Sequence, residues 1–364
     1  MEIRSNNIIL NVEKDTFEVK TNNKTWKSDA DFQAHIILNN GRKIKFENAK
    51  QISVEKISDD LKEGVLTRYR NLKRVNFAFD TMVWIEKATQ NVYFEWIVVN
   101  DNGFDIKEVV WPAPIKEEGC IYLPYYQGIE LDTTQETKEI KAMFTSLEAS
   151  MDFVGMIDSN KNGYMIINET PWDSTYTYKD ASLQLAWLPS LGKMQYRRTL
   201  RYCFMQNTNM EALCAIYKQY KEETNTCTYT EAKKAATTIK LPALYTIQDA
   251  DGSFTKEIMC AKNALLYIKA NIDALKEVEY VNVDGFANRE MEECIHPHHK
   301  MSRKECMEAR SKVFKYLKNK GYKLISEGCA DWVLAYVDCI YWEEKREFGN
   351  KINLFEEVFN KNNC

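Results

Sequence analysis

Apolar and polar residues alternate along roughly the first two hundred positions, in short runs that turn residues interrupt. A period of two is typical of strands that bury one face. Two hairpins are predicted with their turns at the Asn-Gly pairs 40–41 and 162–163, because these residues tolerate the positive φ angles of tight turns. Long helical patterns do not interrupt this series. We therefore predict a large antiparallel β-sandwich over residues 1–207.

The hydrophobic period changes after the sandwich. Residues 208–240 are rich in good helix formers and are interpreted as a helical linker. From 241 to 364 helix and strand alternate: a helical stripe runs through 255–276, a buried strand ends at Asp284, and another strand ends at Glu327. The fold class predicted for the whole chain is multi-domain, an all-β part followed by an α/β part.

A helix is predicted between the strands that end at Asp284 and Glu327. Ser302 and Glu305 have the spacing of a capping box, which satisfies backbone donors at a helix start. The helix should stop at Gly321. Its buried face is expected to carry Cys306, Val313, Phe314 and Leu317. Strand, helix and strand in this order predict a parallel, right-handed crossover.

Composition narrows the class of protein. Hydrophobic residues at 45% and aromatic residues at 12% describe an ordinary globular protein. The 49 basic residues nearly balance the 53 acidic ones, so neither nucleic acid nor an anionic membrane is expected as a partner. Neither a secretory signal nor a membrane-spanning run is visible, and a cytoplasmic location is the expectation. The ten cysteines form no CxxC pair and are interpreted as reduced, mostly buried thiols.

Two carboxylates stand at the ends of successive predicted strands. Asp284 and Glu327 are each followed by glycine. Ligands of parallel α/β sheets bind at the carboxyl ends of the strands, so both side chains should face one cleft. A pair of carboxylates is what glycosidic bond cleavage requires. The alternative is that Asp-Gly is only a turn and Glu-Gly only a strand exit.

A family resemblance supports the catalytic interpretation. Residues 278–342 contain a strand ending in Asp, then "EC" and "HPHHKMSRKE", a helix, "SEG", "DW" and a further acid, Asp338. This segment resembles the catalytic-barrel segment of glycoside hydrolase family 129, the bacterial α-N-acetylgalactosaminidases related to the family 101 endo-enzymes. Residues 156–174 resemble the sandwich segment of the same group. The resemblance implies a galactose-mutarotase-like sandwich followed by a (β/α) barrel.

The resemblance also implies roles. The nucleophile falls on Asp284 and the acid/base on Glu327, in a retaining two-step reaction on α-linked N-acetylgalactosamine of mucin-type glycans or glycopeptides. A carbohydrate or glycopeptide substrate is therefore the expected partner. Residues expected to bind substrate or to support the two acids are Glu293, His296, Arg303, Asp331 and Trp332.

The histidine-rich stretch has two interpretations. Cys294, His296, His298 and His299 carry groups that bind zinc or other transition metals, although their spacing matches no specific zinc pattern. Loops that close a sugar site also use histidine to bind hydroxyl groups. We expect that the chain uses no metal or other cofactor. His298 can also be interpreted as an exposed residue without function.

Tryptophans elsewhere call for simpler interpretations. Trp84, Trp96 and Trp111 lie in strand patterns and are expected in the core. Trp172 and Asp173 either line the cleft from the sandwich side or belong to a loop at the domain interface.

The barrel is expected to be incomplete. The segment after Lys240 is about half as long as the roughly 250 residues of a complete (β/α)₈ barrel. Barrel strands are also expected to be lacking on the N-terminal side of the strand that ends at Asp284. Three explanations are open: the sequence is a piece of a longer protein, it is a shortened relative, or its missing strands come from another chain. Association of copies would also cover open sheet edges. A non-catalytic carbohydrate-binding relative and a metal-dependent hydrolase built on the histidines remain alternative functions.

Overall fold

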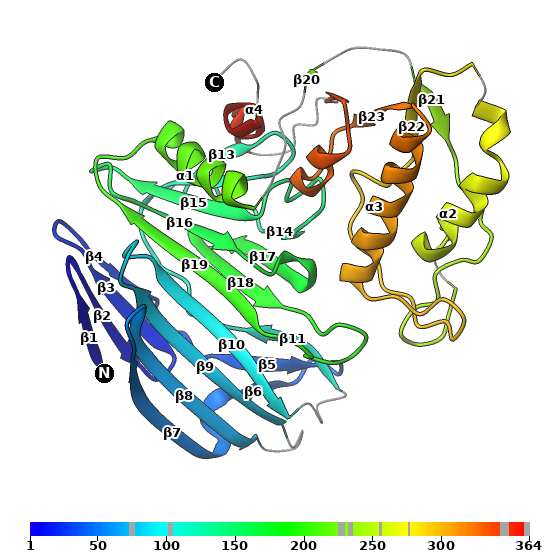
Figure 1. The fold of residues 1–364 in the computed structure, drawn as a ribbon. Coiled ribbons are helices and arrows are strands. Elements are labelled where there is room, and N and C mark those ends of the chain that lie inside the picture. The colour runs from blue at the N-terminus through cyan, green and yellow to red at the C-terminus, as the bar shows by residue number, and fades with distance from the viewer. Residues whose placement is uncertain are drawn as a thin grey trace.

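The computed structural model describes residues 1–72, 77–100, 105–224, 230–231, 236–254, 257–275, 277–342 and 349–359. Strands predominate in the N-terminal part and helices in the C-terminal part (Figure 1).

Three antiparallel sheets build the N-terminal part. The smallest contains β1 (Glu2–Ser5), β2 (Ile8–Glu13), β3 (Thr16–Lys20) and β4 (Thr25–Lys27). A ten-stranded sheet has the order β25 (Asn350–Lys351), β13 (Ile129–Asp132), β12 (Gly119–Leu123), β15 (Phe153–Asp158), β16 (Gly163–Asn168), β19 (Arg198–Met205), β10 (Val92–Asn100), β9 (Phe77–Glu86), β8 (Lys62–Leu72) and β7 (Ala49–Ser58). A six-stranded sheet has the order β14 (Ile140–Met143), β17 (Ser174–Lys179), β18 (Ser182–Trp187), β11 (Ile106–Val110), β5 (His35–Leu38) and β6 (Lys43–Lys45). Short 3₁₀ turns lie at Phe46–Asn48 and Pro171–Asp173.

One hydrophobic core joins these sheets. Alternate residues of the ten-stranded and six-stranded sheets pack together, and the small sheet adds Trp26 and its neighbours. Trp96 and Trp111 are buried in this core, as predicted. Trp84 is only half-buried and stacks on Tyr93, with ring centroids 4.1 Å apart. The predicted antiparallel sandwich is confirmed, whereas its galactose-mutarotase-like character stays a prediction.

Both predicted hairpins are present, but one turn is placed differently. β5 and β6 pair around Gly41, whose φ is +80°. Between β15 and β16 the residue with positive φ is Lys161, at +60°, and not the Asn-Gly pair that follows it. Gly163 already belongs to β16. It is small for another reason: a Cβ there would lie 2.8 Å from the carbonyl oxygen of Met156 and 2.7 Å from Thr208 Cγ2.

A second core lies between the sandwich and the C-terminal part. Helix α1 (Met210–Glu223) packs against the outer face of β15 and β16, and helix α4 (Leu354–Phe359) adds its apolar side chains. Asn209 caps α1 by accepting a hydrogen bond from the backbone N–H of Ala212. In Figure 1 both helices lie on the same side of the ten-stranded sheet. The first half of the predicted helical linker is thus helical.

The second half of that linker is not helical where the structure describes it. β20 (Thr230–Glu231) and β21 (Thr237–Ile239) are strands, and residues 232–235 lie outside the described part. Threonine favours strands because branching at Cβ restricts its side chain in a helix, a signal that the sequence interpretation underweighted. β21 also corrects the expectation that no strand precedes the one ending at Asp284.

The C-terminal part contains a parallel sheet. Its order is β20, β24 (Cys339–Tyr341), β23 (Lys323–Glu327), β22 (Tyr280–Val283) and β21. Each neighbouring pair is parallel, which confirms the predicted parallel arrangement, whereas the handedness of the crossover stays a prediction. Helix α3 (Arg303–Asn319) joins β22 to β23. Closure of these strands as part of a barrel stays a prediction.

The helices of this part differ in how well the sequence predicts them. In α3 the Ser302–Glu305 capping box is formed, and Cys306, Val313, Phe314 and Leu317 are all buried. Helix α2 (Ala261–Ala270) is shorter than the predicted stripe, and a 3₁₀ turn, Ile272–Leu275, continues it. Another 3₁₀ turn, Asp331–Ala335, follows β23.

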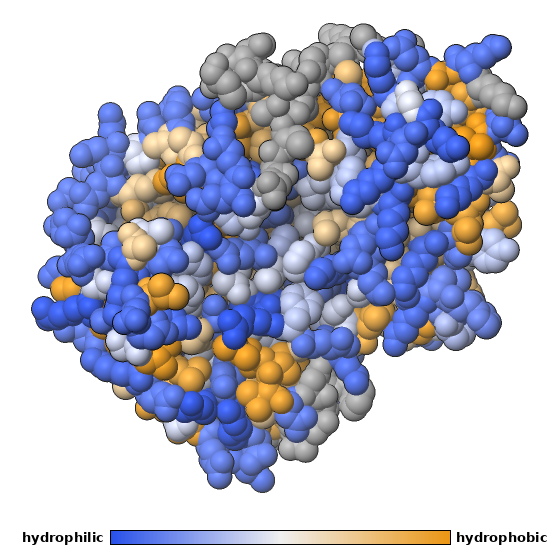
Figure 2. All heavy atoms as spheres, viewed as in Figure 1, coloured by the Kyte–Doolittle hydropathy of each residue, from blue (hydrophilic) through white to orange (hydrophobic). Residues whose placement is uncertain are grey.

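The surface agrees with the composition. Hydrophilic side chains cover most of the face in Figure 2, and apolar ones appear in separate groups. Of the helices described, none is long and apolar enough to cross a membrane. Eight cysteines in the described part are free, and seven of these are buried.

Candidate active site

The two predicted catalytic acids lie at the C-terminal ends of β22 and β23, and therefore at the same end of the parallel sheet. Val281 pairs with Leu324 across these strands. Three residues further along each strand are Asp284 and Glu327. Side chains at matching positions of parallel neighbours point to the same face, and neighbouring strands lie about 4.8 Å apart. Asp284 is exposed and Glu327 is half-buried.

Hydrogen bonds hold the segment after Asp284 against β23. Asn288 Nδ2 donates to the backbone carbonyl of Glu327 at 2.9 Å. The hydroxyl of Tyr341, on β24, lies 3.5 Å from Glu327 Oε2. The backbone N–H of Leu147, in the sandwich, donates to the carbonyl of Asn288 at 3.1 Å. The two acids therefore lie where the sandwich and the parallel sheet meet.

A cavity of about 480 Å³ opens at this meeting point, and we call it the cleft. Its sandwich wall consists of Tyr126, Ser146, Leu147 and Glu148. Its opposite wall consists of Asp284, Asn288, Arg289, Glu290 and Glu292. A volume of 300 to 1,000 Å³ is usual for small-molecule sites. A smaller cavity of about 140 Å³ shares Asp284, Arg289 and Glu292 with the cleft and reaches Arg310.

Arg310 holds the part of the cleft wall that contains Arg289 and Glu290. It lies on the buried face of α3 and is only 3% exposed. Its guanidinium donates to the carbonyls of Arg289 at 2.9 Å and Glu290 at 3.0 Å, and it lies 3.9 Å from the Glu292 carboxylate. Sequence reasoning missed this residue. The available signal was a charged residue four positions after Cys306 on an otherwise apolar stripe.

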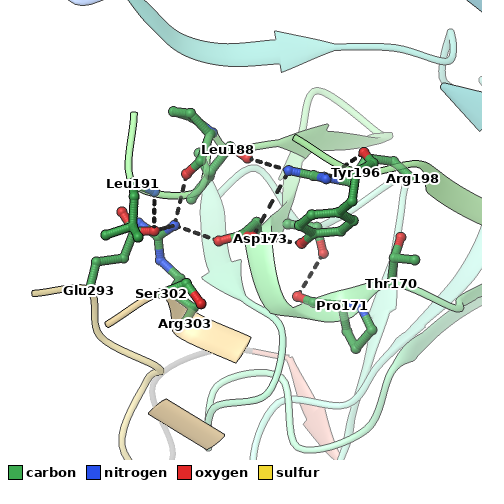
Figure 3. A network of polar contacts seen from close by, with 12 residues as sticks. Thr170, Pro171, Asp173, Leu188, Leu191, Tyr196, Arg198, Glu293, Ser302 and Arg303 are labelled. Atoms are coloured by element: carbon green, nitrogen blue, oxygen red, sulfur yellow. Dashed lines mark hydrogen bonds and ion pairs between the residues drawn. The ribbon is translucent and has the colours of Figure 1, made fainter. Parts of the chain in front are cut away.

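Glu293 and Arg303 lie apart from the cleft, in an ion-pair network with the sandwich (Figure 3). Arg303 Nη1 lies 2.6 Å from Asp173 Oδ1 and 3.3 Å from Glu293 Oε1. Glu293 also accepts a hydrogen bond from the backbone N–H of Leu191 at 2.7 Å. Burial raises the pKa of Glu293, and the guanidinium of Arg303 opposes that rise. Both side chains thus have structural partners, and their role in substrate binding stays a prediction.

Asp173 settles the open interpretation of its loop. Its side chain is fully buried, accepts a hydrogen bond from Tyr196 at 2.6 Å, and lies 3.9 Å from Arg198 Nη2. Figure 3 shows it between the two arginines. The loop at residues 170–174 is therefore an interface loop that anchors the start of α3.

Asp331 is also structural. It is 1% exposed, accepts a hydrogen bond from Tyr217 at 2.5 Å, and pairs with Lys221 at 3.1 Å. Burial, together with the Asp331 carboxylate, raises the pKa of neighbouring Asp152 well above its ordinary value. This network ties α1 to the turn after β23, while the role of Asp331 in substrate binding stays a prediction.

Trp332 and His296 complete the predicted set. Trp332 is half-buried and packs on α3, with its ring centroid 6.2 Å from that of Phe314. His296 stacks on His299, with centroids 4.1 Å apart. In the described part of the chain, neither of them lines the cleft. Of the two predicted catalytic acids, Asp284 lines it and Glu327 does not. His298 is exposed, and His299 is buried beside Cys294.

Solved structures share this fold. The α-N-acetylgalactosaminidase NagBb from Bifidobacterium bifidum, as its GalNAc complex, is 18% identical, with a TM-score of 0.88 over 99% of this chain and 83% of that chain. Its ligand-free form gives a TM-score of 0.85 at 18% identity, over 99% of this chain and 84% of that chain. The resemblance inferred from sequence is therefore confirmed at the level of fold. Searches with protein-family models and against curated protein sequences find no match.

Proposed function

We propose that this chain is a glycoside hydrolase that cleaves α-linked N-acetylgalactosamine, with Asp284 as nucleophile and Glu327 as acid/base. The observation that carries the proposal is that β22 and β23 are parallel neighbours, each followed by or ending in one of the two acids. Asp284 lines the cleft, and the backbone of Glu327 is hydrogen-bonded to Asn288, another cleft residue. Retaining glycosidases hold their carboxyl groups about 5 to 5.5 Å apart, close to the spacing of neighbouring strands. The fold shared with NagBb, which was solved with GalNAc bound, supports the choice of sugar.

The reaction follows from these two positions. In the first step the Asp284 carboxylate attacks the anomeric carbon while Glu327 donates its proton to the departing glycosidic oxygen. A covalent glycosyl-enzyme results. In the second step the Glu327 carboxylate removes a proton from water, whose oxygen attacks the anomeric carbon and releases Asp284, so the α configuration is retained.

The surroundings suit a polar, uncharged ligand. The cleft offers the carboxylates of Glu148 and Glu290 and the guanidinium of Arg289 as partners for sugar hydroxyls. Arg310 holds the carbonyls of the segment that carries Arg289 and Glu290. Because this wall is already held in place, it needs little conformational ordering when the substrate binds. Mucin-type glycans and glycopeptides are the natural substrates that we propose.

Hydrolysis of an aryl α-N-acetylgalactosaminide and of an α-N-acetylgalactosaminyl peptide tests the proposal. We expect Asp284→Asn to lower kcat/KM at least about a thousandfold on both substrates, because the nucleophile is lost. Glu327→Gln should lower it about a hundredfold or more on the peptide and less on the aryl substrate, whose leaving group needs little protonation.

Glu279→Gln is the matched control. Glu279 lies just before β22, at the N-terminal end of the strand and so at the opposite end of the sheet from Asp284. It pairs with Lys323 at 2.7 Å. Its activity should equal that of the wild type, with unchanged circular dichroism in all variants. Turnover that survives both Asp284→Asn and Glu327→Gln would reject the assignment. Sugar binding without turnover by the wild type would support a carbohydrate-binding module instead.

A further inference from the structure

A group of buried metal-binding side chains lies outside the catalytic pair. Cys260 Sγ, Cys294 Sγ and a ring nitrogen of His299 all lie within 4.8 Å of one another. Cys260 and Cys294 are fully buried, and His299 is 7% exposed. Cys294 Sγ and His299 Nδ1 are 3.3 Å apart.

These separations suit a tetrahedral thiolate and imidazole site. With Zn–S bonds of about 2.3 Å and Zn–N bonds of about 2.0 to 2.1 Å, the ligand atoms of a tetrahedral zinc centre lie about 3.5 to 3.8 Å apart. Met301 Sδ lies 3.8 Å from Cys260 Sγ, where a fourth, weaker ligand would be placed. The group therefore needs little rearrangement to surround an ion.

The backbone holds these side chains in place. Cys294 and Met301 exchange two backbone hydrogen bonds of 2.8 Å, which close the short segment that carries His299. The backbone N–H of Gln248 points at Cys294 Sγ, 3.4 Å away. An N–H directed at sulfur stabilises a thiolate, as supporting residues do around metal sites. Cys260 comes from a separate segment, immediately before α2.

We propose that Cys260, Cys294 and His299 bind a thiophilic divalent cation, and that zinc is the ion this ligand set fits. Two thiolates and one imidazole are preferred zinc ligands. The ion would cross-link the segment before α2 to the segment before α3. Met259, which immediately precedes Cys260, and Glu292, two residues before Cys294, line the smaller cavity, so the ion would also fix that wall.

This site differs from the one that the histidine-rich stretch suggests by itself. His298 is exposed and does not belong to the group of Cys260, Cys294 and His299. His296 stacks on the His299 ring instead of joining it as a ligand. Cys260 is distant in sequence, and only the fold brings it to Cys294. The expectation of a chain without a metal is replaced by this proposal, which does not depend on the proposed hydrolase activity.

Metal content of the full-length chain tests the site. The protein is stripped with a chelator under reducing conditions, reloaded with Zn²⁺, separated from free metal and analysed by mass spectrometry of the elements. We expect about one zinc per chain. Cys260→Ser, Cys294→Ser and His299→Asn should each lower zinc content about tenfold, whereas His298→Asn, the exposed neighbour, should retain it. Circular dichroism confirms that each variant is folded.

A second measurement keeps the proposal testable should a cysteine variant fail to fold. Wild-type protein loaded with Co²⁺ should show thiolate-to-cobalt charge-transfer absorption and the visible bands of a tetrahedral centre, and Zn²⁺ should abolish both. Wild-type zinc content no higher than that of Cys294→Ser would overturn the proposal. So would an octahedral cobalt spectrum, or a Cys260–Cys294 disulfide that forms in place of metal binding.

Discussion

Arg303 is the residue for which structure and sequence give opposite expectations, and Arg303→Met distinguishes them. Its guanidinium lies 2.6 Å from Asp173, whose carboxylate is fully buried. Removing one partner of a buried ion pair costs about 3 to 5 kcal/mol, because the other charge is left without compensation. Tyr196 and Arg198 remain near Asp173, so the lower end, about 3 kcal/mol, applies.

Thermal unfolding followed by circular dichroism measures this loss. At about 2.1 cal/mol/K of unfolding entropy per residue, a chain of 364 residues should lose about 4 °C in Tm for 3 kcal/mol. Arg68→Met is the matched control: Arg68 lies at the same 2.6 Å from Glu55, but both side chains are solvent-exposed. Its Tm should hardly change.

Kinetics complete the comparison. Below its Tm, Arg303→Met should keep the wild-type KM for the aryl substrate, because the Arg303 side chain lies apart from the cleft residues in the described structure. A raised KM together with a Tm like that of Arg68→Met would refute the structural role and restore Arg303 as a substrate-binding residue.

Two further predictions concern the sandwich. Burial raises the pKa of Asp15 to about 6, so the folded protein retains a proton that the unfolded chain loses, and wild-type stability should fall as the pH rises from about 4 to about 6. In Asp15→Asn the decrease in the free energy of unfolding between pH 4 and pH 7 should be smaller by about 1 kcal/mol, a value that allows for the partial exposure of Asp15. Urea unfolding at the two pH values measures this decrease. Parallel pH profiles for the variant and the wild type would contradict the prediction. Gly163→Ala should lower the free energy of unfolding by about 1 to 3 kcal/mol, because its methyl group would lie 2.8 Å from the Met156 carbonyl oxygen. An unchanged urea midpoint would show that β16 can shift to make room.

Local features of the fold could be predicted from sequence because their causes are local. The alternation of the strands, the Ser302–Glu305 capping box and the buried face of α3 each depend on residues a few positions apart. The ends of β22 and β23 were predictable for the same reason, and these two strands are parallel neighbours. The hairpin turn at Lys161 shows the limit, since Gly163 is required by a contact with Thr208 and not by its own φ.

The rest of the site depends on contacts between distant segments. Nothing near Asp331 in sequence indicates that Tyr217 and Lys221 occupy its carboxylate. The pairing of Arg303 with Asp173 and the approach of Cys260 to Cys294 are equally remote in the chain. The sandwich wall of the cleft, from Tyr126 to Glu148, adjoins the acids only because the two parts of the fold meet there. Residue type alone could suggest chemistry for these side chains, but not their partners.

The most direct test of the catalytic pair is the anomeric configuration of the azide product. Azide is small enough to replace a missing carboxylate or the attacking water. With Asp284→Ala, azide should attack from the vacated face and give the β-glycosyl azide. With Glu327→Ala, it should attack the covalent intermediate on Asp284 and give the α-glycosyl azide. The account predicts opposite anomers from the two variants by NMR; the same anomer from both, or the reverse assignment, would contradict it.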